Sequence, residues 1–139
     1  MKIEPYLWGF AGRCEEAVEF YKKALGAEVQ MLMRFKDSPE PCGGDGPQPD
    51  GEKIMHGSLK IGDSILMVSD GQCSGDKGPK FEGMSLSLNP ATEADAHKIF
   101  DALKEGGEIS MPLGKTFWSP CFGMVSDRFG VAWMINVVP

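Results

Sequence analysis

Apolar residues recur at helical spacing in two stretches of the chain, which predicts two amphipathic helices. In each stretch the apolar positions fall three or four residues apart and form one stripe on the helix surface. Gly26 suits the left-handed position that ends the first helix. Thr92 and Asp95 suit the cap that begins the second helix, which stops at Gly106-Gly107. The first stripe consists of Ala17, Val18, Phe20, Tyr21, Ala24 and Leu25, and the second of Ala96, Ile99, Phe100 and Leu103.

Short apolar runs bounded by turn-forming residues predict the strands. In the first half these runs are "IEPYLWGF", "AEVQMLMRF", "KIMHGSLKI" and "SILMVSD", the last two joined by the two-residue turn Gly62-Asp63. In the second half they are "MSLSLNP", "EISMP", "FGMVSD" and "VAWMINVV". Each half therefore follows the order βαβββ, a pattern typical of a tandem repeat. We expect an α+β fold in one domain, residues 1–139, with a first module over residues 1–75 and a second over 82–139.

Two further stretches and one short motif are interpreted as connections. Residues 37–53 and 70–83 are rich in Pro, Gly and Asp, which predicts loops, and the second of them lies near the midpoint where a linker would fall. The motif Asp127-Arg128-Phe129-Gly130 resembles the metal-binding Asp-Phe-Gly of protein kinases. No phosphate loop or catalytic loop accompanies it. We interpret it as a hairpin turn in which Asp127 caps, Gly130 supplies a permissive backbone and Phe129 packs.

Composition and charge exclude several classes of function. The chain has 139 residues, 42% of them hydrophobic and 24% charged, which is the profile of a globular protein. Its net charge of -6 argues against a nucleic-acid or anionic-membrane surface. No apolar run approaches the ~18 residues of a membrane span. The first residues, "MKIEPYLWGF", lack the features of a signal peptide, so we expect a cytoplasmic protein.

Candidate metal ligands are few in this sequence. The four cysteines form no CxxC pair, and in a reducing compartment we expect free thiols. The only histidines are His56 and His97, so a zinc site is not expected. His97 stands among charged residues of the second helix and is expected to face solvent. Cys121 is interpreted as structural, although a nucleophilic thiol with His56 as its base stays open.

The repeat and its local motifs resemble a known superfamily. The segments "EPYLWGFAGRCEEAVEFYKKALGAEV", "MHGSLKIGDSILMVSD" and "FWSPCFGMVSDRFGVAWMIN" resemble the PhnB-like branch of the glyoxalase, bleomycin-resistance and extradiol-dioxygenase proteins, also called the vicinal oxygen chelate superfamily. The resemblance covers almost the whole chain. It implies two curved mixed sheets around a cleft that holds a divalent metal, and a homodimer. The branch also carries a 3-demethylubiquinone methyltransferase label, but "GFAG" at residues 9–12 is no SAM-binding turn.

The ligand positions that the resemblance implies lack metal-binding side chains here. They map to Tyr6, Met67, Met134 and either Ser85 or, with the register slipped by one side-chain period, Ser87. Hard divalent ions prefer carboxylate oxygens and imidazole. We therefore expect no metal and no other cofactor.

Side chains on the same strand faces indicate what else could line the cleft. They would line the cleft with mostly apolar side chains and a few polar groups, a composition that suits a small organic ligand with a planar part. His56 is the natural proton-transfer residue, although it could equally be an ordinary half-buried histidine, and Met67 and Met134 ordinary core residues. The predicted cleft residues are Tyr6, Trp8, Ser58, Met67, Ser85, Ser87, Trp118, Met134 and Asn136, with His56 as the catalytic candidate.

Two functions of different classes remain open at this point. The first is a metal-free protein that binds a small molecule, with no nucleic-acid or membrane partner. The second is an enzyme of the superfamily, a lyase, isomerase or dioxygenase-like protein, with a relocated metal or with His56 as general acid–base.

Overall fold

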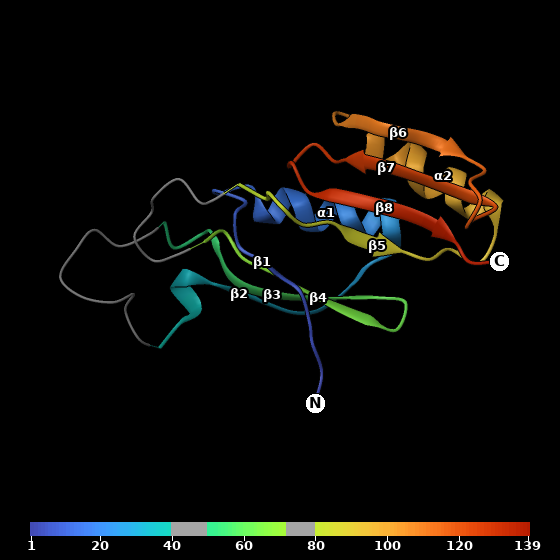
Figure 1. The fold of residues 1–139 in the computed structure, drawn as a ribbon. Helices are drawn as coiled ribbons and strands as arrows, with labels where there is room; N and C mark the ends of the chain where they lie inside the picture. The colour runs from blue at the N-terminus through green and yellow to red at the C-terminus, as the bar shows by residue number, and fades with distance from the viewer. Residues whose placement is uncertain (40–49, 72–79) are drawn as a thin grey trace. The chain divides into compact units, whose positions relative to one another are not determined.

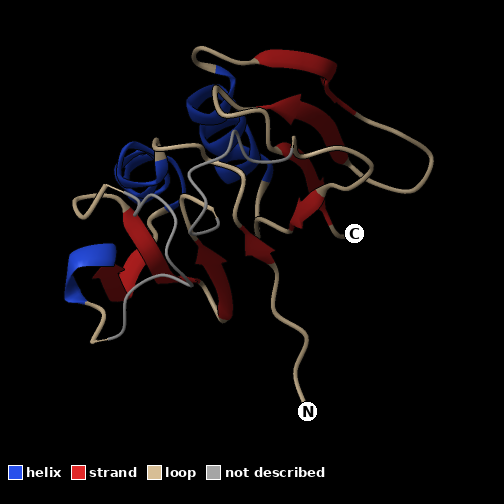
Figure 2. Cartoon of the chain, turned by 90° about the vertical axis from the view of Figure 1, so that its left-hand side faces the viewer, coloured by secondary structure: helices blue, strands red, loops and turns tan. Residues whose placement is uncertain are grey.

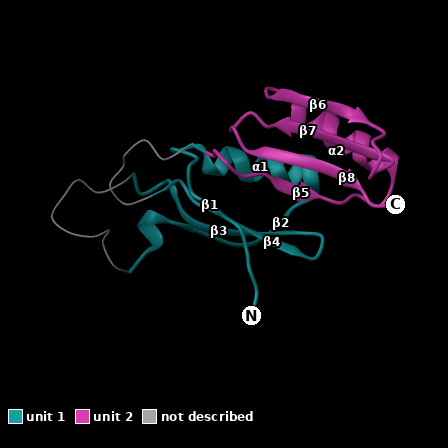
Figure 3. Cartoon of the chain, viewed as in Figure 1, with its two compact units in different colours: residues 1–80 teal, residues 81–139 magenta. Residues whose placement is uncertain are grey.

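The chain forms two compact units, residues 1–80 and 81–139, which Figure 3 shows in different colours. The computed structural model describes residues 1–39, 50–71 and 80–139. Much of the two predicted loops, together with Cys42 and Cys73, lies outside these residues. Each unit contains one α-helix and one four-stranded mixed sheet within the described part of the chain (Figures 1 and 2). The α+β class is confirmed.

The first unit builds its sheet in the order β1-β4-β3-β2. Strand β1 runs parallel to β4, and the remaining neighbours are antiparallel. A short 3₁₀ turn, Phe35–Asp37, follows β2. The elements are β1 (Tyr6–Leu7), α1 (Cys14–Leu25), β2 (Glu28–Arg34), β3 (Ile54–Ile61) and β4 (Ser64–Val68).

The second unit repeats this topology with the order β5-β8-β7-β6. Strand β5 is parallel to β8, and the other pairs are antiparallel, as in the first unit. The βαβββ repeat read from the sequence is therefore present in both halves. The elements are β5 (Leu86–Leu88), α2 (Glu93–Lys104), β6 (Glu108–Gly114), β7 (Cys121–Ser126) and β8 (Ala132–Val137).

The helix ends follow the predicted capping chemistry. Gly26 ends α1 with a left-handed φ of 67°, and its N–H donates to the carbonyl of Tyr21. Thr92 begins α2, where its hydroxyl oxygen accepts a hydrogen bond of 3.1 Å from the N–H of Asp95. Neither helix among the described residues is long and apolar enough to cross a lipid bilayer.

The first strand of each unit is shorter than the sequence pattern predicts. β1 ends at Leu7 because the chain turns soon afterwards, where Ala11 and Gly12 both adopt positive φ values of 52° and 92°. In the second unit Pro90 follows β5 closely, and its fixed φ and missing N–H do not suit a strand ladder. Both first strands therefore make only a brief parallel pairing.

The core of each unit lies between the helix and one face of its own sheet. On the inner strands β3, β4 and β8 buried residues largely alternate with half-buried or exposed ones, whereas the edge strands β2 and β6 bury none of their residues. Of the predicted helical stripes, Phe20, Ala24, Leu25 and Ile99 are only half-buried. The core includes Leu7, Ala17, Val18, Tyr21, Leu59, Leu66 and Val68 in the first unit and Ala96, Phe100, Leu103, Val125, Trp133, Ile135 and Val137 in the second.

The hairpin between β7 and β8 turns on Asp127, as the sequence indicates. One carboxylate oxygen, Oδ1, accepts hydrogen bonds from the N–H groups of Phe129 at 2.9 Å and Val131 at 3.1 Å. The other oxygen, Oδ2, accepts one of 2.9 Å from the indole N–H of Trp133. Gly130 has a φ of 85°. Asp127 is thus a buried turn cap, and both carboxylate oxygens are occupied within the chain.

Candidate functional site

The first sheet has an open face, the one turned away from α1. On β3 the residues Gly57 and Leu59 are buried, and the intervening His56 and Ser58 are half-buried while Lys60 is exposed. Since side chains alternate along a strand, His56, Ser58 and Lys60 share the open face.

Strand pairing gathers the predicted residues of this unit on the open face. Tyr6 is the β-partner of Met67, and Met67 is also the partner of Ser58. On the other side of β3, His56 pairs with Met33 of β2. The face therefore carries a polar pair, Tyr6 and His56, beside the thioethers of methionines.

Tyr6 and His56 contact each other directly. The phenol oxygen of Tyr6 lies 2.8 Å from Nδ1 of His56, a hydrogen-bond distance, and the two ring centroids are 5.4 Å apart at an angle of 41°. Tyr6 keeps 41% of its surface exposed, and His56 is half-buried. The pair is accessible to a molecule that approaches the open face.

The protonation of Tyr6 follows from its surroundings. Partial burial raises the pKa of the Tyr6 phenol above its ordinary value. The hydroxyl of Ser69 opposes this rise, and the charge interaction with Cys14 adds to it. Because the ordinary phenol pKa is about 10, Tyr6 is a neutral hydroxyl near pH 7. It can donate one hydrogen bond.

The second sheet has an equivalent open face of its own. Met134 is half-buried between Trp133 and Ile135, which are buried toward α2, and its β-partner is Ser87. In the first unit Tyr6 is likewise the parallel β-partner of Met67. The strand register thus places Ser87 at the position equivalent to Tyr6, whereas Ser85 precedes β5; both serines are exposed.

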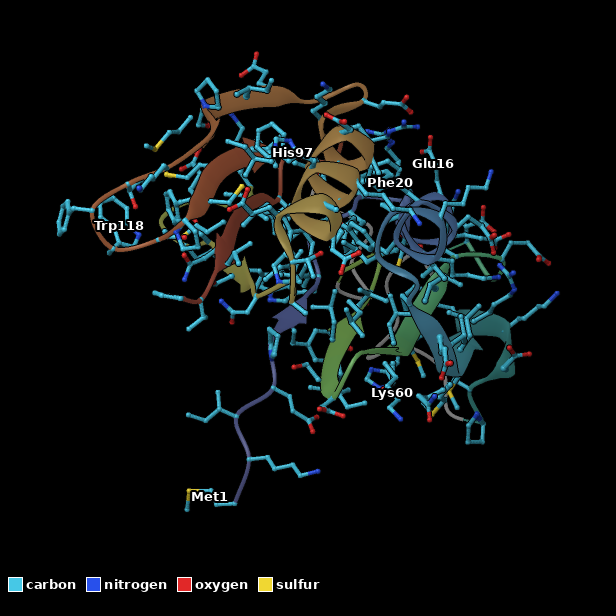
Figure 4. All side chains as sticks on the ribbon, turned by 90° about the vertical axis from the view of Figure 1, so that its right-hand side faces the viewer. Met1, Glu16, Phe20, Lys60, His97 and Trp118 are labelled. Carbon is cyan, nitrogen blue, oxygen red and sulfur yellow. The ribbon has the colours of Figure 1, made fainter. Side chains whose placement is uncertain are left out.

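An aromatic cluster lies beside Met134 on this second sheet. Asn136 is the β-partner of Phe122, and the ring of Trp118 packs edge-on against Phe122 with centroids 5.3 Å apart. The Oδ1 atom of Asn136 is buried and has no hydrogen-bond partner within the described part of the chain. Trp118 remains 45% exposed, and its position in the loop before β7 is visible in Figure 4.

The remaining candidate residues, Trp8, His97 and Cys121, make no contact with the Tyr6–His56 pair that the structure records. Trp8 follows β1 and is 40% exposed. His97 is exposed on α2, as expected (Figure 4). Cys121 is a buried free thiol whose pKa is raised by its burial and, to a lesser extent, by Glu93, so it is poorly suited to act as a nucleophile. The expectation that all ten predicted side chains line one cleft stays a prediction.

The side chains at the superfamily's ligand positions do not fit a hard divalent ion. These positions carry a phenol at Tyr6, thioethers at Met67 and Met134 and a hydroxyl at Ser87. The phenol is already engaged with His56. Across residues 1–39, 50–71 and 80–139, no three His, Cys, Asp or Glu side chains gather closely enough to hold a metal ion. We derive no chemistry through a metal at these positions.

The first unit also contains a polar hollow of about 670 Å³ that the sequence did not indicate. Its charged groups are partnered within the chain: Arg34 pairs with Glu15, and Asp70 accepts from the N–H groups of Cys14 at 2.7 Å and Ile54 at 2.8 Å. No local pattern could have revealed this hollow, because separate stretches of the chain supply it. Its lining consists of Gly12, Glu15, Glu16, Glu19, Arg34, Glu52, Lys53 and Asp70.

Known proteins are similar to this chain in sequence and in fold. Protein YjdN of Escherichia coli (strain K12) is 38% identical over 145 residues, covering 99% of this chain and 96% of the relative. The crystal structure of protein PA1353 from Pseudomonas aeruginosa has a TM-score of 0.86 at 42% identity, covering 99% of this chain and 98% of that one.

A third relative carries the 3-demethylubiquinone methyltransferase label in its description. The PhnB protein from Bacillus cereus, described as a putative 3-demethylubiquinone-9 3-methyltransferase, has a TM-score of 0.78 at 27% identity and covers 99% of this chain and 100% of its own. The model of the Glyoxalase/Bleomycin resistance protein/Dioxygenase superfamily matches residues 9–135. The resemblance stated from the sequence motifs is confirmed, and with nearly its whole length matched the chain belongs to this superfamily and has PhnB-like relatives.

Proposed function

We propose that this protein binds a small organic molecule on the open face of its first sheet, without a resident divalent metal. The observation that carries the proposal is the Tyr6–His56 pair, a polar contact of 2.8 Å beside Met67 on a face that α1 leaves uncovered. An apolar surface with a few oriented polar groups is the usual composition of a small-molecule site. The superfamily's name includes bleomycin resistance, and the proposal follows that functional type.

Metal analysis and a ligand screen test the two parts separately. We expect purified protein to contain no stoichiometric Ni, Zn or Mn, and EDTA to leave its melting temperature unchanged. A melting temperature that falls with EDTA and recovers with one of these metals would contradict the metal-free part. For the binding part, a thermal-shift screen of planar aromatics and small oxoacids should find a compound whose shift is lost in both Tyr6→Phe and His56→Ala. A shift that both variants retain would place the ligand elsewhere.

A second candidate function is an enzyme with His56 as general acid–base. The observation that favours it is again the contact between His56 and a second proton-carrying group, Tyr6. Once the screen identifies a ligand, its conversion can be followed by NMR. Turnover that disappears in His56→Gln while the ligand still binds would support the enzyme, and the absence of turnover in the native chain would leave the binding function alone.

The expected homodimer is also a proposal. It is supported by apolar side chains that the first unit leaves exposed on the edge strand β2, including Val29, Met31 and Leu32 at 39%, 42% and 37%. Size-exclusion chromatography with light scattering should give twice the chain mass of 15.1 kDa. A monomeric mass over the whole accessible concentration range would contradict it.

A further inference from the structure

We infer that Tyr6 fixes His56 in the tautomer that carries its proton on Nε2, so that the open face of the first sheet selects ligands with a carbonyl or carboxylate oxygen. The inference rests on the proposed function and names its ligand class. It also assigns a role to Tyr6, that of a positioning residue acting through the imidazole of His56.

The hydrogen bond between the two side chains has a preferred direction. A neutral imidazole has one nitrogen that donates and one that accepts. A phenol O–H is a much stronger acid than a neutral imidazole N–H, and an imidazole nitrogen is a better acceptor than a phenol oxygen. The favoured form of the 2.8 Å contact between Oη of Tyr6 and Nδ1 of His56 is therefore the one in which Tyr6 donates. The imidazole proton then lies on Nε2.

The Nε2–H group remains available to a ligand. His56 is half-buried, and within the described part of the chain its ring makes no hydrogen bond other than the one to Tyr6. A donor fixed in this way favours an acceptor opposite it. A ligand that places an N–H there leaves two donors facing each other, and such mismatches discriminate strongly between ligands.

The surroundings of His56 define the rest of the ligand. Met33 of β2 is its β-partner. On the other side of β3, Met67 lies on β4, where it pairs with Tyr6 of β1, so the surface beside His56 is polarisable and apolar. Lys60, labelled in Figure 4, lies on the same face near the hairpin end of β3. Its β-partner is Glu28 of the edge strand β2, so an exposed cation and an exposed anion lie on neighbouring strands. The features together fit an aromatic or branched carboxylic acid or ketone.

Long-range ¹H–¹⁵N NMR of the full-length labelled chain tests the tautomer directly. The chain has only two histidines, so His97→Gln assigns the signals. At a pH where imidazole is neutral, Nδ1 of His56 should show the unprotonated nitrogen shift and Nε2 the protonated one. Tyr6→Phe should move the two shifts toward each other as the tautomers mix, and Ser58→Ala, on the same face, should leave them unchanged. A protonated Nδ1 in the native chain would overturn the inference.

Two probes of similar size and opposite charge test the ligand class. Benzoate should shift the His56 signals at millimolar concentration and bind at least about tenfold tighter than benzylamine, which corresponds to about 1.4 kcal/mol. The preference should shrink in Tyr6→Phe. If benzylamine binds as well as benzoate, or if neither probe moves the His56 signals, the ligand-class part is wrong. The tautomer result stands separately, and the proposed function fails only if the wider screen also finds no ligand whose binding needs this face.

Discussion

The carboxylate of Asp127 offers a sharp test of how the second unit is held together. Its Oδ2 atom accepts the indole N–H of Trp133 at 2.9 Å, and its Oδ1 atom accepts two backbone N–H groups. Asp127, Val131 and Trp133 are 3%, 1% and 2% exposed, so water cannot replace the lost acceptor without local opening. The conservative change Asp127→Asn keeps one oxygen for the backbone and sets an NH₂ group against the indole N–H.

The expected cost follows from the donors left unpaired. A buried donor without an acceptor costs about 1–3 kcal/mol, so Asp127→Asn should lower the free energy of unfolding by about that amount through Trp133 alone. Asp127→Ala removes the acceptor from Val131 and Trp133 together and should cost about 2–6 kcal/mol, a large part of the ~5–15 kcal/mol that stabilises a typical domain. Asp127→Asn is therefore the variant to measure first.

Urea unfolding followed by far-UV circular dichroism measures these costs in a double-mutant cycle. In a Trp133→Phe background the indole donor is absent, so Asp127→Asn should cost about 1–3 kcal/mol less than in the native chain. Asp63→Asn, an exposed change in the other hairpin turn, should stay within about 0.5 kcal/mol. Equal costs of Asp127→Asn in both backgrounds, or a cost no larger than that of Asp63→Asn, would refute the reasoning.

Other predictions follow from single features of the structure. Gly107→Ala should lower the free energy of unfolding in urea by about 3 kcal/mol or more, because a Cβ there would lie 2.1 Å from the carbonyl oxygen of Ser126. Gly114→Ala places its Cβ where no atom lies within 4 Å, so it should change that free energy by less than about 1 kcal/mol. Thr92→Ala should cost about 1 kcal/mol by thermal unfolding, and Thr92→Ser should recover most of it. Burial raises the pKa of the Cys14 and Cys121 thiols, so both stay neutral at pH 8 and should resist alkylation by iodoacetamide until the chain unfolds. Peptide mass mapping of alkylated protein measures this, and rapid labelling of either thiol in the folded chain would contradict it.

The position of each helix and strand could be predicted from the sequence because local chemistry specifies it. The first helix, the cap at Thr92 and the turn at Gly62-Asp63 each depend on residues within a few positions of one another, and all three form where the sequence places them. The motif beginning at Asp127 belongs to the same class, since its backbone bonds close within four residues. The lengths of β1 and β5 were overestimated because apolar runs predict extended chain and not where a sheet partner ends.

The contacts of the candidate site required the tertiary structure. Tyr6 and His56 are separated by 50 positions in the chain and meet only because β1 pairs in parallel with β4 beside β3. The choice of Ser87 over Ser85 depends on the register of β5 against β8, which the sequence left open by one side-chain period.

The sequence by itself determined the repeat, the helices, most strands and the family, since periodicity and turn chemistry are local and the motifs are contiguous. The tertiary structure decided which side chains touch: the Tyr6–His56 pair, the third hydrogen bond of Asp127 to Trp133 and the charged lining of the hollow in the first unit. These contacts depend on parallel pairing and on helix packing between distant segments. Their energies come from geometry at the scale of a single hydrogen bond, and a pattern of apolar and polar letters does not encode that geometry.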